Sequence, residues 1–371
     1  MQCFLSQYNN AMYVFGGDSS DVGSVYIYNF AADSWSKQPT TGAPAQLSNS
    51  RSAAVLDHDT NTIYTVAGGG QSMYGLALDS VTNTAGGSVA WEQIGTPAID
   101  TEGPVTAALA NNHINYFGVK GDQAGSASLF VIHFSYWQPQ PQAYPTVDGG
   151  AAFPNSQGQA VSFPTAGNTS PQSMLYVPDD FSNSYVVTHW TNLGDYSSSA
   201  GAPMAANLIN STQILPAPTS KDKAAAYACS PSACAQIDSK GDIYYIDNAL
   251  GSDFAVGSGA QWAKMGFSLT GTPSSGSSSG STNSTDSTAT ATGTNTAAVG
   301  TPTGPSTVSG ADAKTQAGSK TTGSQSGAGA ATGTTEKEGA SSKPSNGAAT
   351  LNSSVFGLTL GALAVAAASL L

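Results

Sequence analysis

The chain has 371 residues, with 23 Asp or Glu against 11 Lys or Arg and a formal net charge of −12 at pH 7. Every Trp and Tyr and all three Cys lie before residue 269, so only that part can build a hydrophobic core. The same part has a single arginine, Arg51, and no basic cluster that could track phosphates, which argues against nucleic acid as a partner. Its acidic, weakly charged surface suits neutral polar ligands or a hydrated protein interface.

A repeating unit begins near the start of the chain, at residues 12–35. An apolar run stops at the pair Gly16–Gly17, a polar loop follows, and an alternating run around Tyr26–Tyr28 leads to Trp35. This pattern predicts three successive strands of one antiparallel sheet, in which the glycines allow a sharp turn. The segment Cys3–Gln7 supplies a fourth strand.

Versions of this unit return about every fifty residues, which is typical of a β-propeller whose blades bury their faces against one another. Clear copies span residues 53–91 and 106–137, and degraded copies begin at Gln159 and near Cys234. The sequence therefore predicts an all-β propeller with about five recognisable blades.

The repeat resembles the kelch repeat, including its use in galactose-oxidase-like propellers. The positions that carry this resemblance are Gly16, Gly17, Tyr28 and Trp35 in the first copy and Gly68, Gly69, Leu78 and Trp91 in the second. Kelch propellers usually have six or seven blades. We therefore expect either a five-bladed ring or a chain that lacks an N-terminal portion with a signal peptide and one or two blades.

Composition divides the chain into three predicted parts: a propeller over residues 1–268, a stalk over 269–346 and an apolar end over 347–371. The stalk is almost wholly Ser, Thr, Gly and Ala, and is expected to be disordered, either as an O-glycosylated stem or as an unmodified linker. The end holds the 17-residue uncharged run Val355–Leu371 with no basic residue after it. A spanning helix needs about 20 residues and usually a basic flank, so a GPI-attachment signal is favoured over a C-terminal membrane helix.

The best GPI attachment residue is Asn346, with Ser345 as the alternative. An external location also agrees with the N-glycosylation sequons at Asn168, Asn210 and Asn283. The first residues of the sequence lack a signal peptide. In layout the chain resembles fungal cell-surface proteins, which predicts a location on the outer leaflet or in the cell wall.

Two of the cysteines, Cys229 and Cys234, are close enough in sequence for a loop disulfide in a secreted protein. A two-thiolate metal site is the rival interpretation, but no His lies nearby. Cys3 is left over, which indicates a partner outside the sequence.

The resemblance to galactose oxidase implies a copper site built from two His, two Tyr and a Cys. The four histidines, His58, His113, His133 and His189, fall in four different places, and we expect each to be a turn or strand residue. The chain also lacks the motifs of serine hydrolases, zinc peptidases and phosphate-binding loops. We therefore predict no catalytic residue, no metal ligand and no cofactor.

Two carboxylate pairs, Asp57-x-Asp59 and Asp179-Asp180, are expected to be solvated turn residues instead of a calcium site. The tryptophans that recur at one position of the repeat are expected to be core residues; they are Trp35, Trp91, Trp137 and Trp262.

The sequence favours a non-enzymatic recognition or adhesion protein at the cell surface, attached to the membrane by a lipid anchor or a C-terminal helix. Its partner would be a surface protein or a glycan, bound through loops on one face of the propeller. The alternative is a galactose-oxidase-like copper oxidase whose ligands lie partly outside this sequence.

Overall fold

The computed structural model describes residues 1–48, 53–57, 59–67, 72–165, 170–190 and 205–269. All of them belong to one compact unit of the chain. The predicted stalk and apolar end lie outside these residues, as do His58, Asn168, Asn283 and Asn346. Within the described residues, no helix has the length and apolar character that crossing a membrane requires.

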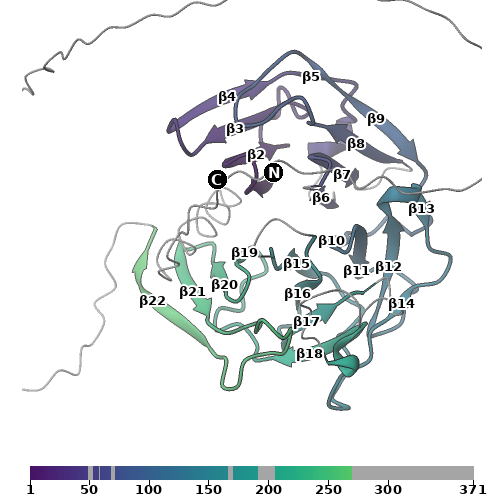
Figure 1. Ribbon diagram of the computed structural model, residues 1–371, viewed down its shortest axis with the longest axis vertical. Helices are drawn as coiled ribbons and strands as arrows, with labels where there is room; N and C mark the ends of the chain where they lie inside the picture. The colour runs from purple at the N-terminus through teal and green to yellow at the C-terminus, as the bar shows by residue number, and fades with distance from the viewer. Residues whose placement is uncertain (49–52, 58, 68–71, 166–169, 191–204, 270–371) are drawn as a thin grey trace, which may run out of the picture. The chain divides into compact units, whose positions relative to one another are not determined.

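Over the described residues the fold is all-β, as predicted, with five sheets of mainly antiparallel strands that we call blades 1 to 5 (Figure 1). Blade 1 contains β1 (Gln2–Ser6), β2 (Ala11–Phe15), β3 (Val25–Asn29) and β4 (Ser34–Gln38). Blade 2 contains β6 (Ala53–Asp57), β7 (Thr62–Val66), β8 (Met73–Ala77) and β9 (Val89–Gly95), with the short β5 (Thr40–Thr41) parallel to β9. Blade 3 contains β10 (Thr106–Ala110), β11 (His113–Phe117), β12 (Ser126–Val131) and β13 (Tyr136–Trp137), with β14 (Gln142–Ala143) also paired to β12.

Blades 4 and 5 follow the same order of strands. Blade 4 contains β15 (Gly158–Ser162), β16 (Ser173–Pro178), β17 (Ser184–Thr188) and β18 (Ser211–Leu215). Blade 5 contains β19 (Ala226–Cys229), β20 (Cys234–Ile237), β21 (Asp242–Ile246) and β22 (Trp262–Ser268). Single turns of 3-10 helix lie at Ala45–Ser48, Ile132–Phe134 and Ala206–Leu208.

The local sequence explains these strands and the tight turns between them. In β3, Val25 and Ile27 are fully buried while Tyr26 lies on the other face, as expected from the period of two in a strand. The turn between the first two strands contains an asparagine with positive φ in the first three blades, at Asn10 and Asn61 and at the pair that begins with Asn111. Asparagine tolerates this conformation better than most residues, so each hairpin can close within a few residues.

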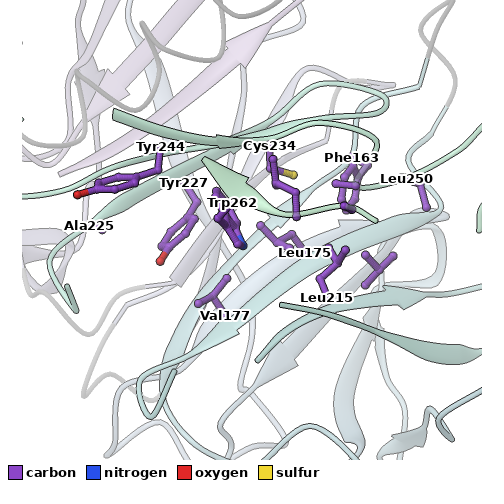
Figure 2. Packing of buried hydrophobic residues seen from close by; sticks show 14 of the residues in the cluster. Phe163, Leu175, Val177, Leu215, Ala225, Tyr227, Cys234, Tyr244, Leu250 and Trp262 are labelled. Carbon is purple, nitrogen blue, oxygen red and sulfur yellow. The ribbon is translucent and has the colours of Figure 1, made fainter. Parts of the chain in front are cut away.

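The blades pack on one another in chain order. Four clusters of buried apolar residues each join two successive blades, from blades 1 and 2 to blades 4 and 5. In the last of these, Trp262 and Tyr227 of blade 5 pack with Leu175 and Leu215 of blade 4 (Figure 2). The innermost strand of each blade packs against that of the next, in the order β1, β6, β10, β15, β19.

The structure corrects three details of the predicted repeat. Leu76, not Leu78, lies opposite Trp91, as Tyr28 lies opposite Trp35. The fourth strand of blade 4 (β18) and the first of blade 5 (β19) carry little of the repeat pattern, and only the sheet pairing identifies them.

The tryptophans are also less uniform than expected. Trp91 and Trp262 are buried and Trp137 is partly buried, but Trp35 is 55% exposed. The prediction that Trp35 is a core residue is wrong, because Trp91 packs on the blade that precedes its own, whereas among the described residues no blade packs on the corresponding side of blade 1.

Candidate functional site

A cavity of about 630 Å³ lies among the innermost strands. Residues of all five of these strands line it, for example Cys3, Ala54, Ala107, Ala160 and Ala226. Most ligand pockets in proteins have volumes of roughly 300–1,000 Å³, so the space suits a small molecule or a short segment of another chain.

The cavity walls are made of strand edges and small side chains. Each innermost strand is the last in its sheet and therefore pairs with a neighbour on one edge only. The other edge carries backbone N–H and C=O groups that can bind an added strand. At Gly158 no side chain fits, because a Cβ there would lie 2.3 Å from the carbonyl oxygen of Val177. Each innermost strand thus has one edge without a strand partner beside the cavity.

Charge near the cavity is limited and largely paired. Lys223 lies 3.7 Å from a carboxylate oxygen of Asp179, and both residues line the cavity. Cys3 is a free cysteine whose burial raises the pKa of its thiol to about 12, so it stays protonated near neutral pH. The cavity therefore favours polar, nearly neutral ligands over strongly charged ones.

Three of the four histidines come closer together than the sequence predicted. The rings of His113, at the start of β11, and His189, directly after β17, have centroids 4.9 Å apart. Burial lowers the pKa of His113, and the nearby, exposed His133 lowers it slightly more. The prediction that the histidines lie in four separate places is thus wrong for these three, because the packing of blade 3 on blade 4 joins strands distant in sequence.

His189 is held in one tautomer between blades 3 and 4. The hydroxyl of the buried Tyr144 donates to Oδ1 of Asn115 at 2.5 Å and so accepts from Nδ1–H of His189 at 2.9 Å. Within the part of the chain that the structure describes, the buried Nε2 of His189 has no hydrogen-bond partner. Burial, with a smaller contribution from the charge of His113, lowers the pKa of His189 to about 3. This imidazole is neutral at physiological pH.

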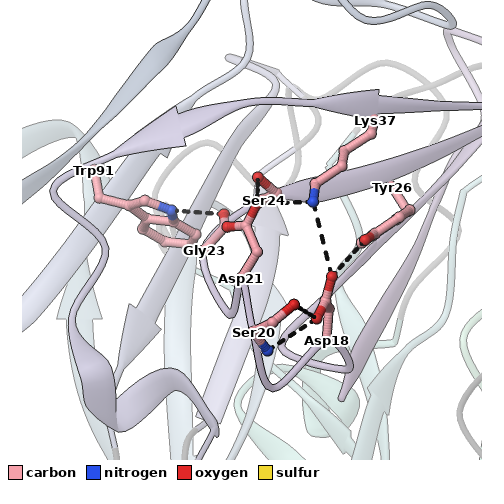
Figure 3. Close-up of polar contacts among 8 residues, drawn as sticks. All are labelled: Asp18, Ser20, Asp21, Gly23, Ser24, Tyr26, Lys37 and Trp91. Atoms are coloured by element: carbon pink, nitrogen blue, oxygen red, sulfur yellow. Dashed lines mark hydrogen bonds and ion pairs between the residues drawn. The ribbon is translucent and has the colours of Figure 1, made fainter.

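A polar network occupies the loop between β2 and β3 (Figure 3). Asp18 accepts hydrogen bonds from Ser20 and from the hydroxyl of Tyr26, and Lys37 lies 2.8 Å from Asp21. The hydrogen bond from Ser20 is the largest cause that lowers the pKa of Asp18, followed by the one from Tyr26. The network orders a loop at the edge of blade 1.

The structure also places several residues singled out from the sequence. Cys229 and Cys234 are joined by a disulfide across the β19–β20 hairpin, with Cα atoms 4.0 Å apart. Asn210 is partly buried, and its side-chain oxygen accepts from the backbone N–H of Trp190. Asp57 is buried and accepts from Thr60, so the prediction that it is solvated is wrong.

Among the described residues, no group of three or more His, Cys, Asp or Glu side chains is arranged to hold a metal ion. The carboxylate pairs Asp57-x-Asp59 and Asp179-Asp180 make contacts of their own. Asp59 accepts from Ser170 of the blade 4 hairpin, and Asp179 pairs with Lys223.

Comparison with known proteins agrees with this architecture. The five sheets, each of four strands or more and packed in chain order, define a β-propeller. The model of the Kelch motif matches residues 3–42, which cover blade 1, and together with the five blades it supports a kelch-repeat propeller. No curated protein matches the chain.

One matching solved structure is the crystal structure of a nidogen/laminin complex, with 10% identity and a TM-score of 0.29. The match covers 50% of this chain and 57% of that chain.

Proposed function

We propose that this protein is a recognition protein at the cell surface and that its kelch propeller is the binding module. Kelch propellers commonly serve as protein-binding modules. The observation that carries the proposal is the central cavity, which is lined by the edge strands of all five blades and by small side chains.

The chemistry of the cavity supports recognition of a polar, extended ligand. Backbone groups on unpaired strand edges bind an added chain by main-chain hydrogen bonds, and side chains near it then select the sequence. The alanines that line the cavity, such as Ala107 and Ala160, leave room for such a ligand. A surface protein segment or a glycan chain would present the matching donors and acceptors.

The cell-surface location rests on the end of the chain. A Ser/Thr-rich segment of about 78 residues, from 269 to 346, would hold the propeller away from the membrane. The candidate attachment residue Asn346, the small residues after it and the final apolar run fit a GPI signal.

The binding role is tested with the full-length protein against a glycan array and a displayed library of random linear peptides. We expect a probe whose binding falls at least tenfold when Ala160 in the cavity is changed to Arg. The matched control is Phe134→Ser, which changes an exposed side chain outside the cavity. Binding that Ala160→Arg leaves unchanged would overturn the cavity as the site, and stoichiometric copper with alcohol oxidase activity would overturn the non-enzymatic role.

The anchor is tested on intact cells with phosphatidylinositol-specific phospholipase C. We expect the enzyme to release the protein, and we expect a bulky residue at Asn346 and Gly347 to prevent surface delivery. Retention on the membrane with a peptide from Val355 onward still present would show a spanning helix instead.

A further inference from the structure

The chain that leaves blade 1 is hydrogen-bonded to the outermost strand of blade 2, and we call the piece of chain that leaves a blade its exit segment. Thr40 and Thr41 of the exit segment of blade 1 pair in parallel with β9 of blade 2. The backbone N–H of Val89 in β9 also donates to the carbonyl of Pro39 at 3.1 Å. The exit segment therefore adds a strand to the outer edge of the next blade, as a bound peptide does in strand addition.

Similar contacts occur at blades 4 and 5. Thr146 of the exit segment of blade 3 forms a parallel bridge with Thr212 of β18 in blade 4. The backbone N–H of Thr212 also donates to the carbonyl of Pro145 at 2.9 Å. In blade 5, the indole N–H of Trp262 on β22 donates at 3.2 Å to the carbonyl of Pro216, which begins the exit segment of blade 4. Contact between an exit segment and the next outermost strand is thus a repeated feature of this propeller.

Blade 3 has an apolar form of this contact. Ile99 of the exit segment of blade 2 and Trp137 of β13 pack against the same cluster of buried residues. The exit segment of blade 2 and the outermost strand of blade 3 therefore share one core.

Blade 1 differs, because no exit segment covers its outermost strand within the described residues. β4 pairs with β3 on one edge, and no backbone hydrogen bond to its other edge occurs in the part of the chain that the structure describes. Ser34, Trp35 and Lys37 of β4 are exposed. The unpaired edge of β4 can therefore accept one added strand.

The exit segment of blade 5 is the one that the order of the blades brings to this edge. The blades pack in chain order, and blade 5 stands next to blade 1 in the ring (Figure 1). The described residues end at Leu269, directly after β22, where the backbone N–H of Leu269 donates to the carbonyl of Gly241 at 2.8 Å. In blades 1 and 4 the exit segment makes its contacts from the first residue after the outermost strand, at Pro39 and Pro216. The same spacing selects the residues that directly follow Leu269.

These residues resemble the other exit segments in sequence. Gly-Thr-Pro at residues 271–273 repeats Gly-Thr-Pro at residues 95–97, where the chain leaves blade 2. Thr next to Pro also occurs in the exit segments of blades 1, 3 and 4, at residues 39–41, 145–146 and 218–219. Residues 270–275 carry no charge, and Lys37 on β4 already pairs with Asp21 at 2.8 Å (Figure 3). An added strand would therefore bury no isolated charge.

We propose that residues 270–275 add to the unpaired edge of β4 as a parallel strand and so join blade 5 to blade 1. One of their carbonyl groups would accept from the indole N–H of Trp35, as the carbonyl of Pro216 accepts from Trp262. The contact closes the ring and fixes blade 1 as the place where the stalk leaves the propeller. It forms within one molecule and does not depend on what the central cavity binds.

Amide hydrogen exchange of the full-length protein, followed by mass spectrometry of peptides that cover β4, tests the proposal. The test variant combines Thr270→Pro, Gly271→Pro and Thr272→Pro, because proline has no N–H to donate to a neighbouring strand. We expect the amides of β4 to exchange at least tenfold faster in this variant than in the wild type. The strand β11 in blade 3 should keep its exchange rate, which would show that the propeller remains folded.

The matched control changes an identical Thr-Gly-Thr triplet farther along the stalk, with Thr292→Pro, Gly293→Pro and Thr294→Pro combined. This control should keep the exchange of β4 at the rate of the wild type. Equal exchange of β4 in all three proteins would overturn the proposal, because the edge would then be open or covered by something else. Equally fast exchange in both proline variants, or protection of β4 that rises with protein concentration, would overturn it as well.

Discussion

Acid should destabilise the contact between blades 3 and 4, and His189 should be a main cause. The unfolded chain binds a proton at a histidine with a pKa near 6.5, whereas burial lowers the pKa of His189 to about 3 in the folded protein. Between these two pH values the unfolded state binds more protons than the folded state. The free energy of unfolding therefore falls as the pH drops below about 6.5.

The size of this effect follows from the two pKa values. At pH 7.5 almost no protonation occurs in either state, and the contribution of His189 is close to zero. A pH of 5.0 is 1.5 units below the pKa of the histidine in the unfolded chain. Protonation of the unfolded state then lowers the free energy of unfolding by about 2 kcal/mol. His113, whose pKa is also lowered by burial, contributes with the same sign.

Urea unfolding of the wild type and of His189→Asn, each at pH 7.5 and pH 5.0, isolates the contribution of His189 to the pH dependence of stability. Asparagine keeps a hydrogen-bond donor for the hydroxyl of Tyr144 and does not titrate. The free energy of unfolding of the variant should therefore fall by about 2 kcal/mol less than that of the wild type between pH 7.5 and pH 5.0. The exposed Phe134, which does not titrate, provides the control Phe134→Ser, which should keep the pH dependence of the wild type. The reasoning is refuted if His189→Asn loses as much stability in acid as the wild type.

Three further predictions concern stability. Trp91→Ala should lower the free energy of unfolding by about 3–5 kcal/mol, because it opens a cavity between blades 1 and 2, whereas the exposed Trp35→Ala should lower it by less than about 1 kcal/mol. Chemical denaturation of both variants measures the difference. Peptide mapping without reduction should recover Cys229 joined to Cys234, and replacing both by Ser should cost about 2 kcal/mol, as expected for so short a loop; a freely alkylated thiol at either position would contradict this. Gly118→Ala should lower the free energy of unfolding by about 1–3 kcal/mol, because Gly118 has φ +72° and a Cβ would lie 2.4 Å from the carbonyl oxygen of Ser156, while Gly87→Ala, with open space around it, should be tolerated.

The sequence by itself determined the repeat and therefore the fold class. Alternation such as that of Val25, Tyr26 and Ile27 is a local property of a strand, and glycine and asparagine mark the turns because few other residues tolerate positive φ. Each of these signals lies within a few residues of the chain and does not depend on which sheets pack against the strand. The sequence did not predict β18 and β19, where these signals are weak.

Only the tertiary structure decided which of the repeated residues are buried and which meet. Trp35 and Trp91 have the same local pattern, but Trp91 packs on another blade and Trp35 is exposed. His113 and His189 are 76 residues apart in the sequence (189 minus 113), and the packing of blade 3 on blade 4 brings their rings to 4.9 Å. The central cavity likewise exists only because five distant strands share one centre. Burial, pKa and cavity shape depend on what covers a residue, and in a propeller that cover comes from another blade, not from neighbours in the sequence.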